Sequence, residues 1–310
     1  MESQICLDLT RIAGEAEFVV IHDGEKIVEA YFIPYASLRG FEKLVVGKNP
    51  LFAIEAVMRI CGLCHAAHGI AAAEAFEHAL GIMPPKNGLA LREAIGLLNR
   101  VQSHLLHAFF LCFDVFRRDR IVEASRKVLL ALEDVNFALT RIGLAPTHPP
   151  AIVIGGVQKA PSEKTLNETL SKLKALESKM EDLKEAFMDE DSWNENFATL
   201  KEIGLASRKV ASHLFYGDRY NVDVSAISTV RYDEYKPTDF AREVSKKSTS
   251  LVALYDGKPV EVGPRARLAI YRDFDGTRLA DIQAARLEEL ELSLRRVEEL
   301  LEEVNLGEPT

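Results

Sequence analysis

The sequence has 310 residues, of which 47% are hydrophobic and 27% are charged, with a formal net charge of −9 and a pI near 5.5. This composition is typical of a globular protein with a substantial core and argues against a disordered chain. The acidic balance argues against a nucleic-acid partner, because binding to a polyanion relies on clustered Lys and Arg. No apolar run reaches the roughly 20 residues that span a bilayer. Residues 1–10 lack the pattern of a signal peptide, so we expect a cytoplasmic protein without a membrane span.

The first forty residues predict a small β-sheet. Residues 18–21 and 27–33 are rich in β-branched side chains, and between them Asp23-Gly24 is a strong hairpin signal. From Asn49 onward the apolar residues recur at helical spacing, with Pro50 where a helix tolerates proline. The sequence therefore predicts an N-terminal β region, residues 1–48, and a helical bundle domain, residues 49–310.

Long helices are expected to dominate the second region. Apolar residues recur every three or four positions over segments 69–80, 89–118, 121–143, 165–187 and 277–305, and a further helix is expected over 196–214. Between two of them, residues 144–161 form a loop rich in proline, with Gly155-Gly156, that is a candidate to line a site. The predicted fold class is mainly α, a long-helix bundle with a small N-terminal β-sheet.

Four cysteines are too few for a secreted disulfide scaffold, so we expect reduced thiols. Cys6 and Cys112 are isolated among apolar neighbours, which favours buried structural thiols. Cys61 and Cys64 form a Cys-x-x-Cys pair, whose two sulfurs suit one soft or borderline metal or a reversible disulfide. A zinc site would need a second such pair and a thioredoxin-like site would need alternating β and α units, and the sequence predicts neither.

The segment from Arg59 to His68 reads Arg-x-Cys-Gly-x-Cys with a histidine four residues later. It resembles the N-terminal metal motif of nickel-iron hydrogenase large subunits. Further matches in chain order are Thr10-Arg11-Ile12 with Gly14, Phe41-Glu42-Lys43 with Gly47 and Pro50, Ser103-His104 with His107 and Asp114, His148-Pro149 with Gly155-Gly156, and Val262-Gly263-Pro264 with Ala266-Arg267-Leu268. The resemblance extends along nearly all of the chain.

The resemblance implies a nickel-iron centre held partly by this chain. Cys61 would be a terminal nickel thiolate, and Cys64 would bridge nickel and iron. His68, one helical turn from Cys64, would hydrogen-bond to the bridging sulfur and tune its electron density. Arg59 would add positive charge near an anionic cluster.

Two carboxylates also match the family. The resemblance implies that Glu42 is a magnesium ligand and that Asp114 pairs with an arginine near the metal centre. From the residues alone, Glu42 is equally an ordinary solvated side chain and Asp114 a buried salt bridge. His104 and His107 share a helix face, and we interpret them as core histidines rather than ligands.

The sequence departs from the family at two places. Ala13 replaces the glutamate that passes protons from the nickel-bound thiolate, and alanine cannot relay a proton. The sequence ends at Thr310, without the terminal Asp-Pro-Cys-x-x-Cys-x-x-His that completes the nickel ligation in the family. We therefore expect a second chain to carry the other cysteine pair, in addition to the iron-sulfur small subunit that partners this family.

The first functional hypothesis is the N-terminal part of a split nickel-iron hydrogenase large subunit that catalyses reversible H2 oxidation. Both cysteines, with Arg59 and His68, favour it. The alternative is a non-catalytic hydrogenase-like scaffold subunit of an electron-transfer complex, which Ala13 favours. A third hypothesis is a stand-alone Cys-x-x-Cys protein that binds zinc or acts in redox exchange.

Overall fold

The computed structural model describes residues 3–12, 14–204, 207–216 and 222–306. The chain forms two compact units. The first comprises residues 1–40 and 219–261, and the second comprises residues 41–218 and 262–310. The sequence predicted one boundary after residue 48, whereas in the structure residues 219–261 return to the first unit.

The first unit contains an antiparallel sheet of three strands, β1 (Ser3–Asp8), β2 (Ala16–His22) and β3 (Ile27–Pro34), in the order β1-β2-β3. The predicted hairpin is confirmed, since the Asp23 amide donates to the Lys26 carbonyl and Gly24 has a φ of 102°, which suits glycine. The sheet packs on α9 (Asp239–Lys247) through a core of Val19, Ile21, Tyr31, Ile33, Ala241 and Val244. This shared core is why residues 219–261 belong to the first unit. The other elements here are η4 (Val224–Ala226), α8 (Tyr232–Tyr235) and the hairpin of β6 (Ile227–Val230) with β7 (Val252–Tyr255).

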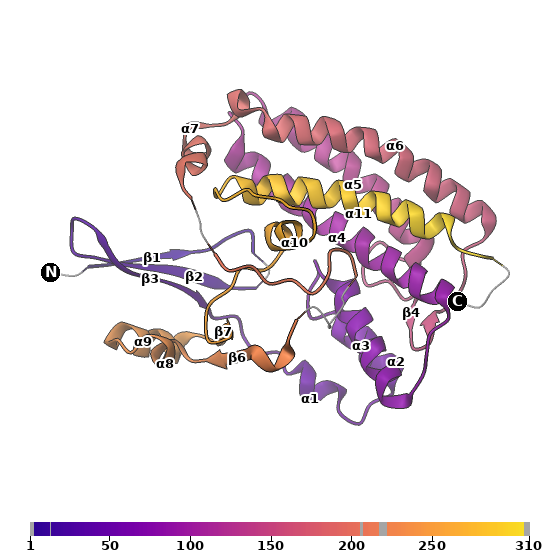
Figure 1. Ribbon diagram of the computed structural model, residues 1–310, viewed down its shortest axis with the longest axis horizontal. Coiled ribbons are helices and arrows are strands. Elements are labelled where there is room, and N and C mark those ends of the chain that lie inside the picture. Colours follow the sequence, from indigo (N-terminus) through magenta and orange to yellow (C-terminus); the bar gives the residue numbers. More distant parts are fainter. Residues whose placement is uncertain (1–2, 13, 205–206, 217–221, 307–310) are drawn as a thin grey trace. The chain divides into compact units, whose positions relative to one another are not determined.

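Four long helices form the body of the second unit. They are α4 (Lys86–Val115), α5 (Ile121–Gly143), α6 (Glu163–Met188) and α11 (Asp281–Glu302). Each packs on the next, and α11 closes the ring against α4 (Figure 1). Their apolar stripes meet in one core, in which Leu98 and Leu105 of α4 are fully buried. The predicted fold class is confirmed.

Shorter elements complete this unit. They are α1 (Phe41–Val45), α2 (Pro50–Met58), α3 (His65–Leu80), β4 (Ile152–Val153), β5 (Gly156–Val157), η1 (Glu190–Ser192), α7 (Glu195–Ala198), η2 (Thr199–Glu202) and α10 (Pro264–Tyr271). Helices α2 and α3 approach so closely that a Cβ at Gly69 would lie 2.8 Å from the Met58 side chain. In the described part of the chain, no helix has the length and apolar character needed to cross a membrane.

The predicted helix over residues 196–214 is wrong. Only the short α7 and η2 form there, and the described residues that follow are irregular. The physical reason is that carbonyl groups of this segment bond to side chains of other elements instead of to amides one turn further along. Tyr271 Oη lies 2.7 Å from the Ser212 carbonyl oxygen, and Arg100 donates to the carbonyls of Leu214 and Phe215.

One buried ion pair fixes the glycine loop that the sequence singled out. Arg92 of α4, fully buried, donates to both carboxylate oxygens of Glu77 on α3, at 2.9 and 2.6 Å. The same guanidinium donates to the carbonyls of Val153 and Gly156 at 2.8 and 3.0 Å. The Gly155 amide donates to Glu77 at 2.7 Å, so two helices and the loop share one polar junction.

Replacing Arg92 with Met should leave the Glu77 carboxylate buried without its partner. We expect the free energy of unfolding, measured by chemical denaturation, to fall by about 3–5 kcal/mol. Arg141→Met is the matched control, because Arg141 forms a surface ion pair with Glu168 and such pairs contribute about 1 kcal/mol or less. Equal and small losses in the two variants would contradict the structural role of Arg92.

Candidate metal centre

The cysteine pair lies in the turn that joins α2 to α3. Cys61 is half-buried in this turn, and Cys64 is the exposed residue that immediately precedes α3. The two thiols hydrogen-bond to each other, and the Leu63 amide donates to the Cys61 sulfur at 3.4 Å. A backbone donor and the N-terminus of a 16-residue helix both favour negative charge on these sulfurs.

Without a metal, Cys64 is a neutral thiol at physiological pH. Burial, together with the hydrogen bond and charge of Cys61, raises the pKa of Cys64 to about 12. A metal ion bound here would have to displace the thiol proton, because the thiolate is the ligand form. Without a metal, the pair therefore offers two neighbouring sulfur atoms, and the sulfur of Cys64 holds its proton tightly.

Polar side chains of α4 hold the cysteine turn. The Asn99 side chain donates to the Leu63 carbonyl at 3.0 Å and accepts from the Ala66 amide at 3.2 Å. It also donates to Gln102 at 3.0 Å, and the Gln102 oxygen lies 3.2 Å from Nε2 of His65. Backbone groups on both sides of Cys64 are thus fixed to one helix.

The same network reaches the proline-rich loop. The Gln102 amide donates to the Pro146 carbonyl at 2.9 Å, and the buried His65 ring packs on that of His148, with centroids 5.1 Å apart. His148 has a φ of 51°, an unusual conformation for a residue other than glycine. Burial lowers the pKa of His148, and the positive charge of Arg59 lowers it further. The prediction that this loop lines a site stays a prediction, but one end of it does contact the residues that hold the turn.

A cavity of about 430 Å³ opens beside Cys64. Cys64, Ala67, Ala71 and Glu74 line it from one face of α3. Side chains of α4, among them Arg100, complete the lining together with Phe215, Tyr216 and Arg267. Concave sites of this size with a few convergent polar groups are typical of ligand-binding pockets.

Arg59 and His68 lie on either side of the pair along the chain. Arg59 is exposed and donates to the Glu55 carbonyl at 2.7 Å, while its charge acts on His148. His68 is half-buried on α3, and its amide donates to the Cys64 carbonyl at 3.2 Å. Their roles toward a metal stay predictions.

Glu42 and Asp114 do not join the cysteine pair in a described metal site. Glu42 is exposed on α1. Asp114 lies near the end of α4, where its carbonyl accepts from Asn194 at 2.5 Å. It is fifteen residues beyond Asn99, a separation of about 22 Å along an α-helix. Among the residues that the structure describes, no group of three or more His, Cys, Asp or Glu is arranged to hold a metal ion.

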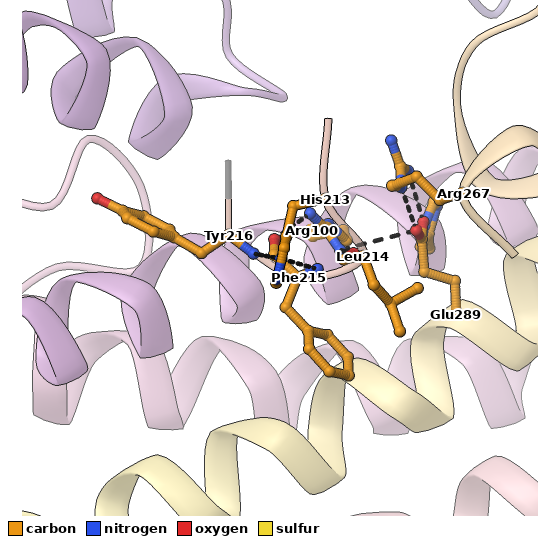
Figure 2. Close-up of polar contacts among 8 residues, drawn as sticks. Arg100, His213, Leu214, Phe215, Tyr216, Arg267 and Glu289 are labelled. Carbon is orange, nitrogen blue, oxygen red and sulfur yellow. Dashed lines mark hydrogen bonds and ion pairs between the residues drawn. The ribbon is translucent and has the colours of Figure 1, made fainter. Parts of the chain in front are cut away.

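The sequence did not reveal the ionic cluster at the far side of the cavity. Glu289 of α11 is fully buried and bonds with both carboxylate oxygens to Arg267 (Figure 2). His104 Nε2 lies 2.8 Å from this carboxylate, which agrees with the interpretation of His104 as a core histidine, and Arg100 lies 3.6 Å away. Burial alone would raise the pKa of Glu289, but these donors and positive charges lower it to about 2.

Comparison with known proteins identifies the family. A family model described as "Nickel-dependent hydrogenase" matches residues 39–115. The chain is 34% identical to the coenzyme F420 hydrogenase subunit alpha of Methanocaldococcus jannaschii, over 97% of this chain and 73% of that protein. It is 30% identical to the subunit of the same name from Methanothermobacter thermautotrophicus, over 100% of this chain and 76% of that protein. This chain belongs to the nickel-dependent hydrogenase family.

The fold agrees with that assignment. The Ni-Fe-Se hydrogenase of D. vulgaris Hildenborough in its as-isolated oxidized state superposes with a TM-score of 0.80 at 22% identity, over 100% of this chain and 81% of that one. At this identity the likeness concerns the fold alone. Within a nickel-dependent hydrogenase fold, the Cys61 and Cys64 pair falls inside the segment that the family model matches.

Acid should reveal the contribution of Glu289. Because its pKa in the folded protein is depressed from 4.5 to about 2, its stabilisation is fully present above pH 4.5 and is lost as the pH falls toward 2. At 1.36 kcal/mol per pH unit, the shift corresponds to about 3 kcal/mol. Glu289→Gln should therefore unfold at lower denaturant concentration at pH 7, with the difference from the wild type shrinking below pH 4.5.

Glu303→Gln provides the control for this titration. Glu303 is an exposed carboxylate that follows α11, and its replacement should change stability by less than about 0.5 kcal/mol. A Glu289→Gln deficit that stays constant from pH 7 to pH 2 would show that the carboxylate charge is not the cause.

Proposed function

We propose that this chain forms part of the catalytic large subunit of a nickel-iron hydrogenase, in which Cys61 and Cys64 contribute two thiolate ligands. The observation that carries the proposal is a pair of mutually hydrogen-bonded thiols beside a cavity of about 430 Å³, in a chain of the nickel-dependent hydrogenase family. Thiolates are ligands that suit nickel and iron. The bound centre would supply the chemistry of reversible H2 oxidation.

The remaining ligands come from outside the described residues in this proposal. Two thiols cannot satisfy a nickel-iron centre, and the described residues offer no third donor clustered with them. We propose that a second polypeptide supplies the other cysteine pair, so that the centre forms between two chains. Glu42 stays a proposed magnesium ligand, since its exposed carboxylate is available to such a partner.

The residues of this chain then have distinct tasks. The Leu63 amide and the start of α3 stabilise negative charge on the thiolates. His68, one turn into α3, would hydrogen-bond to the Cys64 sulfur, and Arg59 would add positive charge at the edge of the site. Asn99 binds backbone groups on both sides of Cys64 and so holds this part of the turn against α4. Asp114 lies outside the proposed site.

An iron-sulfur small subunit is the proposed electron partner. Two relatives of this chain are named alpha subunits, a name that implies further subunits in those proteins. Before the cysteine turn, α1, α2 and the residues between them expose four large apolar side chains, namely Leu44, Val46, Leu51 and Phe52. Exposed apolar side chains beside a redox centre form a surface that can bind another subunit.

The scaffold alternative is favoured by one residue. Ala13, which lies outside the described residues, replaces a glutamate that the family uses to relay protons. A scaffold would not need such a relay. It would also not need its cysteines for metal retention, which separates the two hypotheses.

Cys64→Ser in the purified assembled complex tests the proposal. Replacing a proposed bridging thiolate should abolish stoichiometric nickel and iron, measured by elemental analysis, and H2-dependent dye reduction, while the complex still assembles. Cys6→Ser is the matched control, because it also replaces an exposed thiol but in the first compact unit. The expectation that Cys6 is buried is wrong, since it lies on the exposed edge strand β1. Full retention of metal and activity in Cys64→Ser would refute the hydrogenase proposal and leave the scaffold.

The isolated 310-residue chain gives a second test. Because it presents two thiols without further clustered donors in its described part, it should bind nickel poorly and show no hydrogenase activity. Stoichiometric nickel and iron with H2-dependent dye reduction in the isolated chain would contradict the two-chain centre.

A further inference from the structure

Cys61 and Cys64 are two free thiols in direct contact. All four cysteines lie in the described residues, and each is a free thiol. The Cys61 and Cys64 thiols share a hydrogen bond, whereas Cys6 lies on β1 of the first compact unit and Cys112 is fully buried on α4. Two sulfurs within hydrogen-bond distance need only a small movement to reach the roughly 2 Å of a disulfide bond.

The turn that carries the pair has room for this movement. Gly62, Leu63 and Cys64 are exposed. A Cβ placed on Gly62 would lie more than 4 Å from every described residue other than its chain neighbours. On the other side of the turn, Asn99 binds the Leu63 carbonyl and the Ala66 amide. The Cys64 end is therefore held by α4, while a small backbone adjustment at Gly62 displaces no neighbour.

The two sulfurs have different surroundings, which suit them to different steps of an oxidation. The Leu63 amide donates to the Cys61 sulfur at 3.4 Å, and such a donor stabilises the thiolate that attacks an oxidant. Cys64 is exposed and hydrogen-bonded to Cys61. Cys61 is therefore suited to attack first, and Cys64 is placed to attack the Cys61 sulfur afterwards.

We propose that Cys61 and Cys64, when they hold no metal, form a reversible disulfide with an oxidant of the glutathione disulfide class. The Cys61 thiolate attacks one sulfur of the oxidant, which forms a mixed disulfide and releases one glutathione thiolate. Cys64 then loses its proton to solvent and attacks the Cys61 sulfur, which breaks the mixed disulfide and releases the second glutathione. The pair gives up two protons and two electrons, and one glutathione disulfide becomes two glutathione molecules.

This disulfide would exclude a metal from the pair. Its sulfurs are not thiolates, and the thiolate is the form that binds a metal ion. The consequence for metal insertion rests on the proposed function, whereas the formation of the disulfide does not. Within that function, the reaction that precedes metal insertion is a thiol–disulfide exchange that returns two electrons to Cys61 and Cys64.

Equilibration of the complete 310-residue chain with glutathione buffers, after treatment with a chelator, tests the disulfide. After alkylation and digestion, mass spectrometry should find the peptide with both cysteines unalkylated and two hydrogens lighter. At a fixed ratio of reduced to oxidised glutathione, tenfold dilution of the buffer should raise the ratio of disulfide to dithiol about tenfold, because each internal disulfide releases two glutathione molecules. Excess reduced glutathione should restore both thiols.

Cys6 is the matched control within the same sample, because it is an exposed thiol in the other compact unit. It should form only a glutathione adduct, whose population at a fixed ratio does not change on dilution. In Cys64→Ser, the adduct should accumulate on Cys61, which then has no neighbouring thiol to displace it. Cys112 is fully buried and should stay unmodified, so its modification would report unfolding.

The results in the isolated chain decide the proposal without reference to hydrogenase activity. A pair that stays reduced in excess oxidised glutathione, or that carries a glutathione on each sulfur, would overturn it. Failure of the adduct to form on Cys61 in Cys64→Ser would also overturn it, because Cys61 would not be the attacking thiolate.

The purified assembled complex separates this proposal from the proposed function. During stepwise removal of nickel by a chelator in oxidised glutathione, the disulfide should appear in proportion to the nickel lost, with both measured on the same samples. A disulfide that forms while all nickel is retained would refute the ligand role of the pair. Complete loss of nickel without a disulfide would overturn the redox proposal and leave that ligand role standing.

Discussion

The second compact unit is organised around polar side chains on the buried faces of α4. Each of these side chains needs a hydrogen-bond partner at its own position along the helix. Arg92 faces the glycine loop, Asn99 and Gln102 face the cysteine turn, and Arg100 and His104 face residues 211–216 and α11. An unsatisfied polar group in such a place would cost about 1–3 kcal/mol. Each of these residues thus selects one position for a segment distant in sequence, and the rise of 1.5 Å per residue sets their spacing.

Rigidity at the cysteine turn follows from this arrangement rather than from the turn itself. The turn contains Gly62 and only a few residues between α2 and α3, so its own sequence does not fix the sulfurs. The Asn99 side chain binds backbone groups on both sides of Cys64, and the tight contact at Gly69 fixes α3 against α2. Preorganisation of this kind lowers the conformational entropy that ligand binding must offset.

Sequence reasoning succeeded where the relevant signal is local. Apolar periodicity predicted α5 at its observed bounds, and Asp23-Gly24 predicted the hairpin, whereas the role of Cys61 and Cys64 as metal ligands stays a prediction. It failed where the partner is distant: the helix expected over 196–214 does not form, because its carbonyl partners, Arg100 and Tyr271, belong to other elements. Residues 219–261 joined the first unit for the same reason, since α9 completes the core of the sheet.

The proposed metal site between two chains has a consequence for assembly. Asn99 binds the backbone on both sides of Cys64, whose raised pKa means that a metal cation would have to displace the thiol proton. A metal that bridges this pair to donors elsewhere would make metal binding and assembly one linked equilibrium, in which each stabilises the other by mass action. In the proposed site, the polar face of α4 would contribute to that linkage without touching the metal, because it removes conformational freedom that the cysteine turn would otherwise lose on binding.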